Sequence, residues 1–334
     1  MAKELNQRSI AMAAAVATDW APAYSISIPQ FRNTDVVKVD GKKIDLAPLS
    51  ASLSKPGYLV GAKTCEFTPG LNLQGIEGYY ATVARDWRLD SIFRACGWIR
   101  SSASNTITLK LPVLGNIMRK IAASYEAARI ILAEIAEDGQ AVLWDVANCI
   151  GNLEISGTAG AEIQMTPTLK GTYAAPSTGA APTPNTGTNV CEYMQNSSAT
   201  ITITSGSTIT DVIAKSFKMN AGFEINDWTD FGSPEGISGQ RRSDRKPTHE
   251  LVVGMDYSKY VELLLCWSGG YAKRMKVNFT HGTIAGRFCK FTLWGQLTNM
   301  PRGGEINLRT LTLSFDGVPS VAGNVDDEYQ IDLY

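Results

Sequence analysis

The chain has 334 residues, of which 44% are hydrophobic and 19% are charged, with a formal net charge of −1 at pH 7. That length accommodates two domains, since about 150 residues per domain is the usual prior. The composition excludes a disordered chain, and the charge lacks the excess of Lys and Arg that is typical of a DNA-binding domain. No stretch reaches the roughly 20 apolar residues that a membrane-spanning helix needs.

The first residues predict an N-terminal arm over residues 1–19. Residues 10–16 are apolar and follow Lys3 and Arg8, as in a signal peptide, but the run is short and consists mostly of alanine. We expect the segment to remain uncleaved, so that the protein is made and used in a cytoplasm, with no partner in a membrane.

Alternation of polar and apolar residues predicts β-strands along most of the chain. The alternation is clearest in residues 24–28, 106–111, 200–204 and 308–315. Asp-Gly pairs at 40–41, 138–139 and 316–317 are typical of hairpin turns, because glycine takes the positive φ that such turns require. The predicted fold class is therefore mainly β with small helices.

Two segments have the periodicity of an amphipathic helix. In residues 83–96 and 117–135, apolar side chains recur about every 3.6 residues. From Ala128 onward a second interpretation stays open, because apolar residues on both sides of Asp138-Gly139 suit a β-hairpin equally well.

A change in composition divides the chain at residues 173–198. Residues 174–187 are only Ala, Pro, Ser, Thr, Gly and Asn, have almost nothing to bury, and predict a linker. We therefore expect a first β domain over 20–172, a second over 199–317, and an acidic C-terminal tail over 318–334.

Four short matches occur in the same order on both sides of this linker. They pair residues 26–37 with 201–213, 63–67 with 246–251, 93–98 with 264–267, and 164–171 with 308–317. Because the order is collinear, the matches predict a divergent tandem repeat.

Few residues in the sequence are candidates for catalysis. Six cysteines lie far apart; their even number permits disulfides, but free and mostly buried thiols suit a long chain without a secretory framework better. A base for Cys266 would have to come from His249 or His281, and Cys266 lies in the apolar run 261–267, which favours core packing. Clustered His and Cys at zinc spacing do not occur in the sequence, so we predict no catalytic, metal or cofactor residue.

Charge is concentrated in two places. The basic residues are Arg241, Arg242, Arg245 and Lys246. The acidic residues near the C-terminus are Asp326, Asp327, Glu328 and Asp332. The basic run has no interleaved aromatic residue, which favours a solvated loop or an inter-subunit salt-bridge partner over a nucleic-acid site. The acidic run either forms a solvated terminus or contacts that basic loop on a neighbouring ring of subunits.

Several segments resemble the major tail tube proteins of long, non-contractile-tailed bacteriophages. Residues 60–67, followed by Ser-Ile-Phe-Arg-Ala-Cys-Gly-Trp at 91–98, are similar to a strand that precedes an L-R-A-C-G-F-like element in that family. Residues 151–155 and 169–176 resemble the family's G-N-…-F-T-G-x-Y-x-A-P region. Asp-Arg-Lys-Pro-Thr at 244–248 and the later Gln-Leu-Thr at 296–298 resemble the second half of these proteins. The helical pattern at 116–137 departs from the family.

The resemblance implies tandem β-sandwich domains with a small helix, and rings whose inner sheets join into one continuous β-barrel. Stacked rings would form a tube in the virion tail, assembled in the bacterial host's cytoplasm. The implied partners are further copies of the chain, the tape measure protein, other tail proteins, and double-stranded DNA in non-specific passage. No catalytic residue and no cofactor are implied.

The repeat and the resemblance together predict a ring of three two-domain chains with pseudo-sixfold symmetry, against the alternative of six chains. We expect an acidic or neutral lumen, because a cationic wall would bind DNA phosphates. The rival functions are a monomeric two-domain β-sandwich adhesin or binding module, another tube-like secretion or injection component, and, third, an enzyme.

Overall fold

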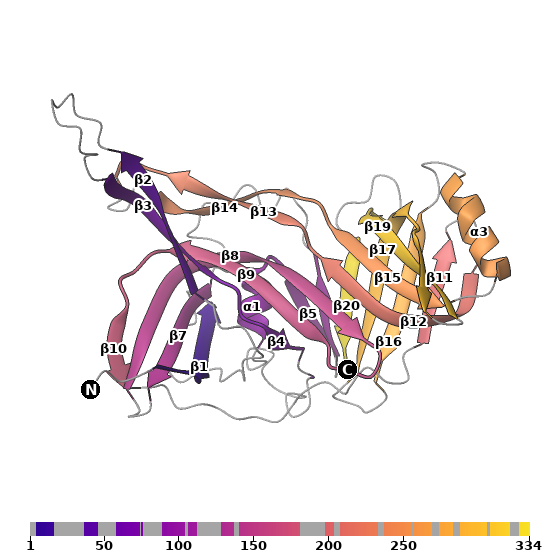
Figure 1. The fold of residues 1–334 in the computed structure, drawn as a ribbon, viewed down its shortest axis with the longest axis horizontal. Coiled ribbons are helices and arrows are strands. Elements are labelled where there is room, and N and C mark those ends of the chain that lie inside the picture. Colours follow the sequence, from indigo (N-terminus) through magenta and orange to yellow (C-terminus); the bar gives the residue numbers. More distant parts are fainter. Residues whose placement is uncertain are drawn as a thin grey trace.

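The computed structural model describes residues 5–16, 37–45, 58–73, 75, 89–103, 106–111, 128–136, 140–180, 198–203, 208–232, 237–254, 257–268, 274–282, 288–305, 308–320 and 327–334. Across these residues the protein is mainly β, with a large antiparallel sheet, a separate two-stranded ribbon and two helices (Figure 1). No helix in the described ranges is long and apolar enough to cross a membrane.

The elements fall into two halves along the chain. The N-terminal half contains β1 (Leu5–Val16), β2 (Val37–Asp45), β3 (Tyr58–Phe67), β4 (Leu71–Asn72), α1 (Asp90–Ala95), β5 (Ile99–Ala103), β6 (Thr106–Lys110), β7 (Ala128–Ala136), β8 (Gln140–Thr158), β9 (Gln164–Thr172) and β10 (Ser177–Ala180). The C-terminal half contains β11 (Ser198–Ile203), β12 (Thr208–Asn220), β13 (Phe223–Thr229), β14 (Ile237–Arg245), β15 (Thr248–Gly254), α3 (Tyr257–Ser268), β16 (Met275–His281), β17 (Cys289–Asn299), β18 (Arg302–Glu305), β19 (Leu308–Gly317) and β20 (Tyr329–Leu333).

The strands follow the two-residue period of the sequence. In β16 and β17 alternate residues are buried, and β6 buries Ile107 and Leu109 between more exposed threonines. The strands predicted at 106–111, 200–204 and 308–315 are confirmed as β6, β11 and β19. The strand predicted at 24–28 lies outside the described residues.

The two halves share one pattern of antiparallel pairing. In the N-terminal half the pairs are β1–β7, β7–β8, β8–β9, β9–β3, β3–β2 and β8–β10. In the C-terminal half the corresponding pairs are β11–β16, β16–β17, β17–β19, β19–β15, β15–β12 and β17–β20, and β11–β12 and β18–β19 also pair. In each half a helix comes after the equivalent strand: α1 after β3 and the short β4, and α3 directly after β15. This correspondence supports a tandem repeat, and we call residues 5–180 repeat 1 and residues 198–334 repeat 2.

The pairing register identifies equivalent residues. Phe67 pairs with Leu169 in repeat 1, as Leu251 pairs with Leu313 in repeat 2. The local sequences agree: Thr-Cys-Glu-Phe at 64–67 matches Thr-His-Glu-Leu at 248–251, and Thr-Pro-Thr-Leu at 166–169 matches Thr-Leu-Thr-Leu at 310–313.

The same register makes Val37, the partner of Phe67, equivalent to Phe217, the partner of Leu251. The match made by sequence alone, which placed Val37 opposite Ile213, is therefore displaced by four residues.

Two strand pairs join the repeats into one sheet. β12 pairs with β8, and β20 pairs with both β17 and β6. One contiguous core runs through both repeats and includes Tyr329, Ile331 and Leu333 of β20. The segment predicted as an acidic tail thus ends in a buried strand.

Some predicted local structures are wrong. The helix predicted over 117–135 is wrong from Ala128 onward, where β7 and β8 form the alternative hairpin and β7 also pairs with β1. The pairs at 40–41 and 316–317 lie within β2 and β19 rather than in turns. Residues 241–245 lie in β14 and are not a loop.

The helix predicted over 83–96 is present as α1, Asp90–Ala95, while residues 83–88 lie outside the description. Helix α3, which contains the apolar run 261–267, was missed. The barrel that would span several chains stays a prediction.

Candidate assembly interface

The joint between the two repeats begins with strand addition. Residues 216–220 of β12 pair antiparallel with residues 154–158 of β8. Beside this pairing, the Asn152 amide donates a hydrogen bond to Asn220 Oδ1 over 2.7 Å, and Lys218 Nζ lies 3.0 Å from Glu154 Oε1. The joint is therefore formed by backbone pairing between the two strands, and contacts between polar side chains stabilise its register.

A ribbon from repeat 2 extends the joint. The β13–β14 ribbon runs across the β8–β9 side of repeat 1 (Figure 1). Lys170 Nζ of β9 lies 2.8 Å from Asp227 Oδ2 of β13. Arg242 of β14 is buried and donates a hydrogen bond to the carbonyl of Ala95, at the end of α1. We call this ribbon contact and the β12–β8 pairing together the internal joint.

Glycines permit the close approaches at this joint. Gly222, between β12 and β13, has φ +68°, and a Cβ there would lie 1.9 Å from the Lys246 carbonyl oxygen. Gly97, after α1, has φ +83°, and a Cβ there would lie 3.1 Å from the Phe223 ring. Both positions therefore require glycine.

The basic run and the acidic C-terminus meet within one chain. Arg245 donates to both carboxylate oxygens of Glu328 over 2.9 Å, and the two side chains are only 4% and 9% exposed. Asp327 accepts a hydrogen bond from the backbone of Ser320, and Asp332 accepts one from the Thr108 hydroxyl. These groups have structural partners without a neighbouring subunit.

The remaining charged candidates lie closer to solvent. Arg241 is exposed, with its guanidinium carbon 5.0 Å from the centroid of the Trp228 ring. Lys246 is exposed and lies 3.8 Å from Asp244 Oδ2. Asp326 lies outside the described residues. A contact of these residues with another subunit stays a prediction.

The two surfaces that meet in the internal joint each have a counterpart elsewhere in the molecule, and neither counterpart has a further strand partner among the described residues. Among the described strands, β2 pairs with β3 alone, although its equivalent β12 pairs with both β15 and β8. In the same described part of the chain, β18 pairs only with β19. We call residues 37–40 the β2 edge.

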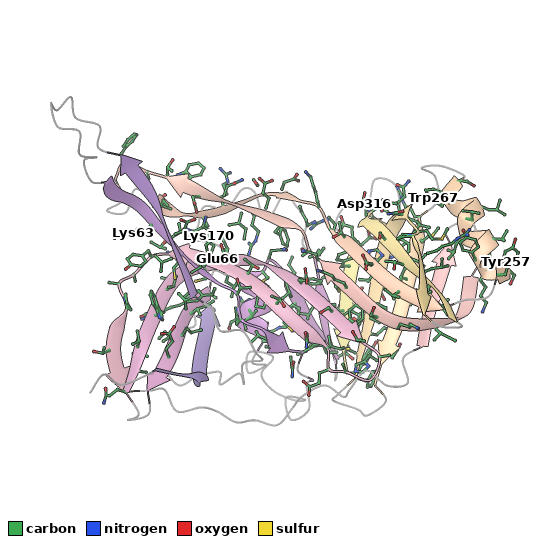
Figure 2. All side chains as sticks on the ribbon, in the orientation of Figure 1. Lys63, Glu66, Lys170, Tyr257, Trp267 and Asp316 are labelled. Carbon is green, nitrogen blue, oxygen red and sulfur yellow. The ribbon has the colours of Figure 1, made fainter. Side chains whose placement is uncertain are left out.

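Burial differs accordingly between equivalent residues. Val39 on the β2 edge is 43% exposed, whereas the equivalent Met219 is 1% exposed in the joint. Leu265 of α3 is 63% exposed, whereas Ala95 of α1, which the sequence match between 93–98 and 264–267 places opposite it, is buried. The β2–β3 ribbon and α3 lie at opposite ends of the molecule, and Trp267 and Tyr257 project at the α3 end (Figures 1 and 2).

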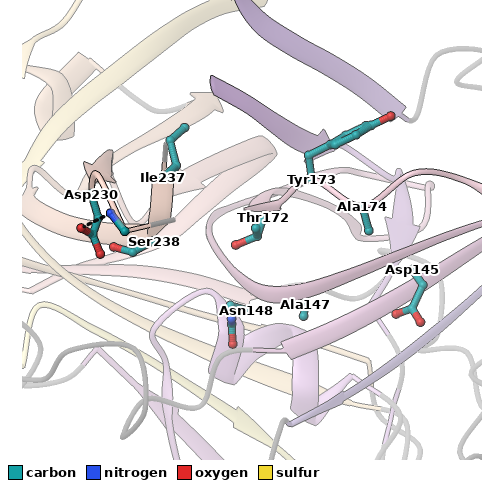
Figure 3. Close-up of a pocket in the computed structure, with 10 residues that line it drawn as sticks. Asp145, Ala147, Asn148, Thr172, Tyr173, Ala174, Asp230, Ile237 and Ser238 are labelled. Carbon is teal, nitrogen blue, oxygen red and sulfur yellow. Dashed lines mark hydrogen bonds between the residues drawn. The ribbon is translucent and has the colours of Figure 1, made fainter. Parts of the chain in front are cut away.

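An open pocket of about 480 Å³ lies beside the end of the β13–β14 ribbon (Figure 3). Its carboxylates have structural partners: Asp145 accepts a 2.7 Å hydrogen bond from Arg129 Nε, and Asp230 accepts a 2.9 Å bond from the Gly232 amide. The bond to Asp145 raises the pKa of Arg129. None of the described residues that line the pocket is His or Cys, so these residues form neither a Cys–His nor a Ser–His pair.

Burial favours the neutral forms of the Cys65 and Cys96 thiols and of the His249 imidazole. Cys65, Cys96, Cys149 and Cys289 are buried, as predicted, while Cys191 and the side chain of Cys266 are outside the description. Burial raises the pKa of Cys65 to about 11 and that of Cys96 to about 12, away from the thiolate that catalysis needs.

His249 is buried, its Nδ1 lies 3.1 Å from the Tyr329 hydroxyl, and burial lowers its pKa to about 3. Within the described ranges, no group of three or more His, Cys, Asp or Glu side chains could hold a metal ion.

Comparisons with known proteins do not assign a family. No family model matches the chain, and no curated protein matches it in sequence. The internal joint and its two unfilled counterparts are therefore the features from which a function can be inferred.

Proposed function

We propose that this chain is a structural virion protein that polymerises head to tail into rings. Stacked rings would form the tail tube of a long, non-contractile-tailed bacteriophage, a conduit through which genome DNA enters the host. The observation that carries the proposal is the pair of joint surfaces that no other described strand fills, the β2 edge and the β18–α3 end, at opposite ends of one molecule.

Strand edges with no partner are normally a hazard, because they offer backbone groups to any other strand. A chain whose two different ends complement each other makes heterologous contacts, which form a ring if the rotation between copies closes. The same surfaces thus become an assembly device, and the role requires no catalytic group, metal or cofactor.

The tandem repeat supports three chains per ring. Each chain brings two domains of similar pairing pattern, so three chains supply six domains around one axis. In such a ring the joint inside each chain is covalently tethered, whereas the joint between chains depends on packing alone.

The placement of charge agrees with DNA passage. Arg242 and Arg245 are buried at the internal joint and in the ion pair with Glu328. Cations held in this way cannot bind DNA phosphates in a lumen, and the net charge is only −1. We expect the tape measure and other tail proteins to contact the assembled rings.

Electron microscopy of the purified full-length chain tests the proposal. We expect rings or tubes with threefold symmetry and six similar densities per ring. Monomers at all concentrations would contradict the proposal and favour the adhesin or binding module. Six equivalent chains per ring would leave the tube but contradict the three-chain ring.

A further inference from the structure

We infer that the β2 edge of one copy pairs antiparallel with β18 of the next copy, with Lys38 opposite Glu305. The β2–β3 ribbon then covers the α3 end of that copy, as the β13–β14 ribbon covers α1 inside the chain. The inference rests on the proposed self-assembly and assigns the strands and the register that produce it.

The identity of the acceptor strand follows from β9 and β19. Leu153 of β8 pairs with Pro167, and Arg302 of β18 pairs with Leu311. Since Pro167 and Leu311 occupy equivalent places in the Thr-x-Thr-Leu segments, Arg302 is equivalent to Leu153. Residues 303–305 of β18 are therefore the counterparts of 154–156, which accept β12 in the internal joint.

The identity of the added strand follows in the same way from β12. Val-Lys-Val-Asp at 37–40 is equivalent to Phe-Lys-Met-Asn at 217–220. Lys218 pairs with Ser156 in the internal joint. Replacing each residue by its equivalent places Lys38 opposite Glu305, Val39 opposite Gly304 and Asp40 opposite Gly303.

Charge supports this register. Lys38 and Glu305 have opposite charges, and directly opposed charges of opposite sign stabilise antiparallel pairs. In the internal joint Lys218 is opposite Ser156 and makes a diagonal ion pair with Glu154, two residues along β8, so a charge pair across the joint has a precedent although its partner differs. A slip of one residue would place Lys38 opposite Gly304 and turn every side chain of β2 to the other face.

Burial supports the partner. The β2 edge exposes Val39, whose counterpart Met219 is buried between strands, and α3 exposes Leu265 and Trp267. Because the β2–β3 ribbon and α3 lie at opposite ends of the molecule, one copy cannot fill its own surfaces (Figure 1). When two copies associate in this way, the β2 edge of one covers the β18–α3 end of the other. One surface of each kind remains uncovered and can bind further copies.

Disulfide cross-linking of the full-length chain tests the register. The variant Lys38→Cys with Glu305→Cys, oxidised under conditions in which wild-type chain assembles, should give a ladder of covalent oligomers that reduction removes. Each single variant, the wild type, and the off-register variant Asp40→Cys with Glu305→Cys should give at least tenfold less.

A charge reversal provides a second measurement without cysteines. Lys38→Glu should raise the concentration needed for assembly about tenfold, and adding Glu305→Lys should restore it. The matched control Lys110→Glu, another exposed strand lysine, should assemble as wild type does.

The outcomes separate this inference from the proposed function. Tubes or rings without the Lys38–Glu305 ladder, or a covalent dimer from Lys38→Cys alone, would overturn the strand assignment and leave self-assembly standing. Monomeric wild-type chain at every concentration would overturn both.

Discussion

Helices α1 and α3 occupy equivalent places in the two repeats, but their surroundings differ. Ile92, Phe93 and Ala95 of α1 are fully buried, and Arg242 of the β13–β14 ribbon binds the end of that helix. Helix α3 instead exposes Tyr257 and Leu265. The β13–β14 ribbon of repeat 2 covers α1 of repeat 1, and no equivalent ribbon covers α3 among the described residues. Exposed apolar groups at α3 are typical of an interaction surface.

The largest change should come from breaking the ion pair that holds β20 between the repeats. Glu328→Ala leaves the buried Arg245 charge without its carboxylate, and we expect the free energy of unfolding in urea to fall by about 3–5 kcal/mol. Lys246→Ala, at an exposed neighbour, should change it by less than about 0.5 kcal/mol. Equal effects of the two variants would show that the pair contributes nothing.

Removing the ribbon's contact with α1 should have the next largest effect. Arg242→Ala deletes a charge-assisted hydrogen bond to the Ala95 carbonyl, which should lower the free energy of unfolding by about 1.5–3 kcal/mol. Arg241→Ala changes the adjacent exposed arginine and serves as the control. A loss confined to Arg241→Ala would contradict the orientation of β14.

The repeats should also differ in their response to acid, because His249 occupies the place of Cys65. The pKa of His249 is about 3 in the folded protein and about 6.5 when exposed, so between these values the unfolded chain binds a proton that the folded chain does not. Stability should therefore decrease as pH falls below about 6.5, by about 1.4 kcal/mol per pH unit from this group. Urea titrations of wild type and His249→Cys between pH 7 and pH 4 should show a smaller slope for the variant; identical slopes would exclude His249 as the source.

The smallest effect on stability should come from the uncovered helix. Leu265→Ser changes an exposed side chain, and the free energy of unfolding of the monomer should shift by less than about 0.5 kcal/mol. Assembly measured by sedimentation should nevertheless require a higher concentration, since the sequence match places Leu265 opposite Ala95, whose carbonyl Arg242 contacts in repeat 1. Unchanged assembly would mean that the α3 end stays uncovered.

Several features were accessible from sequence. The strands at β6, β11 and β19 follow from alternation, and the buried thiols follow from cysteine spacing. The collinear matches located β3 with β15 and β9 with β19, whose pairings are equivalent. Signals of this kind are local, and equivalent strands keep them because the same face of the sheet is buried in each repeat.

Other features depended on partners far along the chain. Residues 128–135 satisfy a helical period, yet they lie in β7, because β1 and β8 supply backbone partners on both sides. Arg242 and Glu328 read as surface charges, but a carbonyl of α1 and the guanidinium of Arg245 allow their burial. Hydrophobic periodicity and runs of charged residues are local patterns, so they do not indicate partners that are distant in sequence.

The sequence by itself determined that the chain is mainly β and predicted that its two halves are related, because alternation and matched segments are properties of neighbouring residues. Only the tertiary structure decided which edges are filled. Strand pairing joins residues that are distant in sequence, so β12 is interior while β2, with the same alternation of apolar and polar residues at 37–40, has one partner among the described strands. That difference comes from which strand of the other repeat lies beside each one: β8 of repeat 1 pairs with β12, whereas no equivalent of β8 pairs with β2 among the described strands.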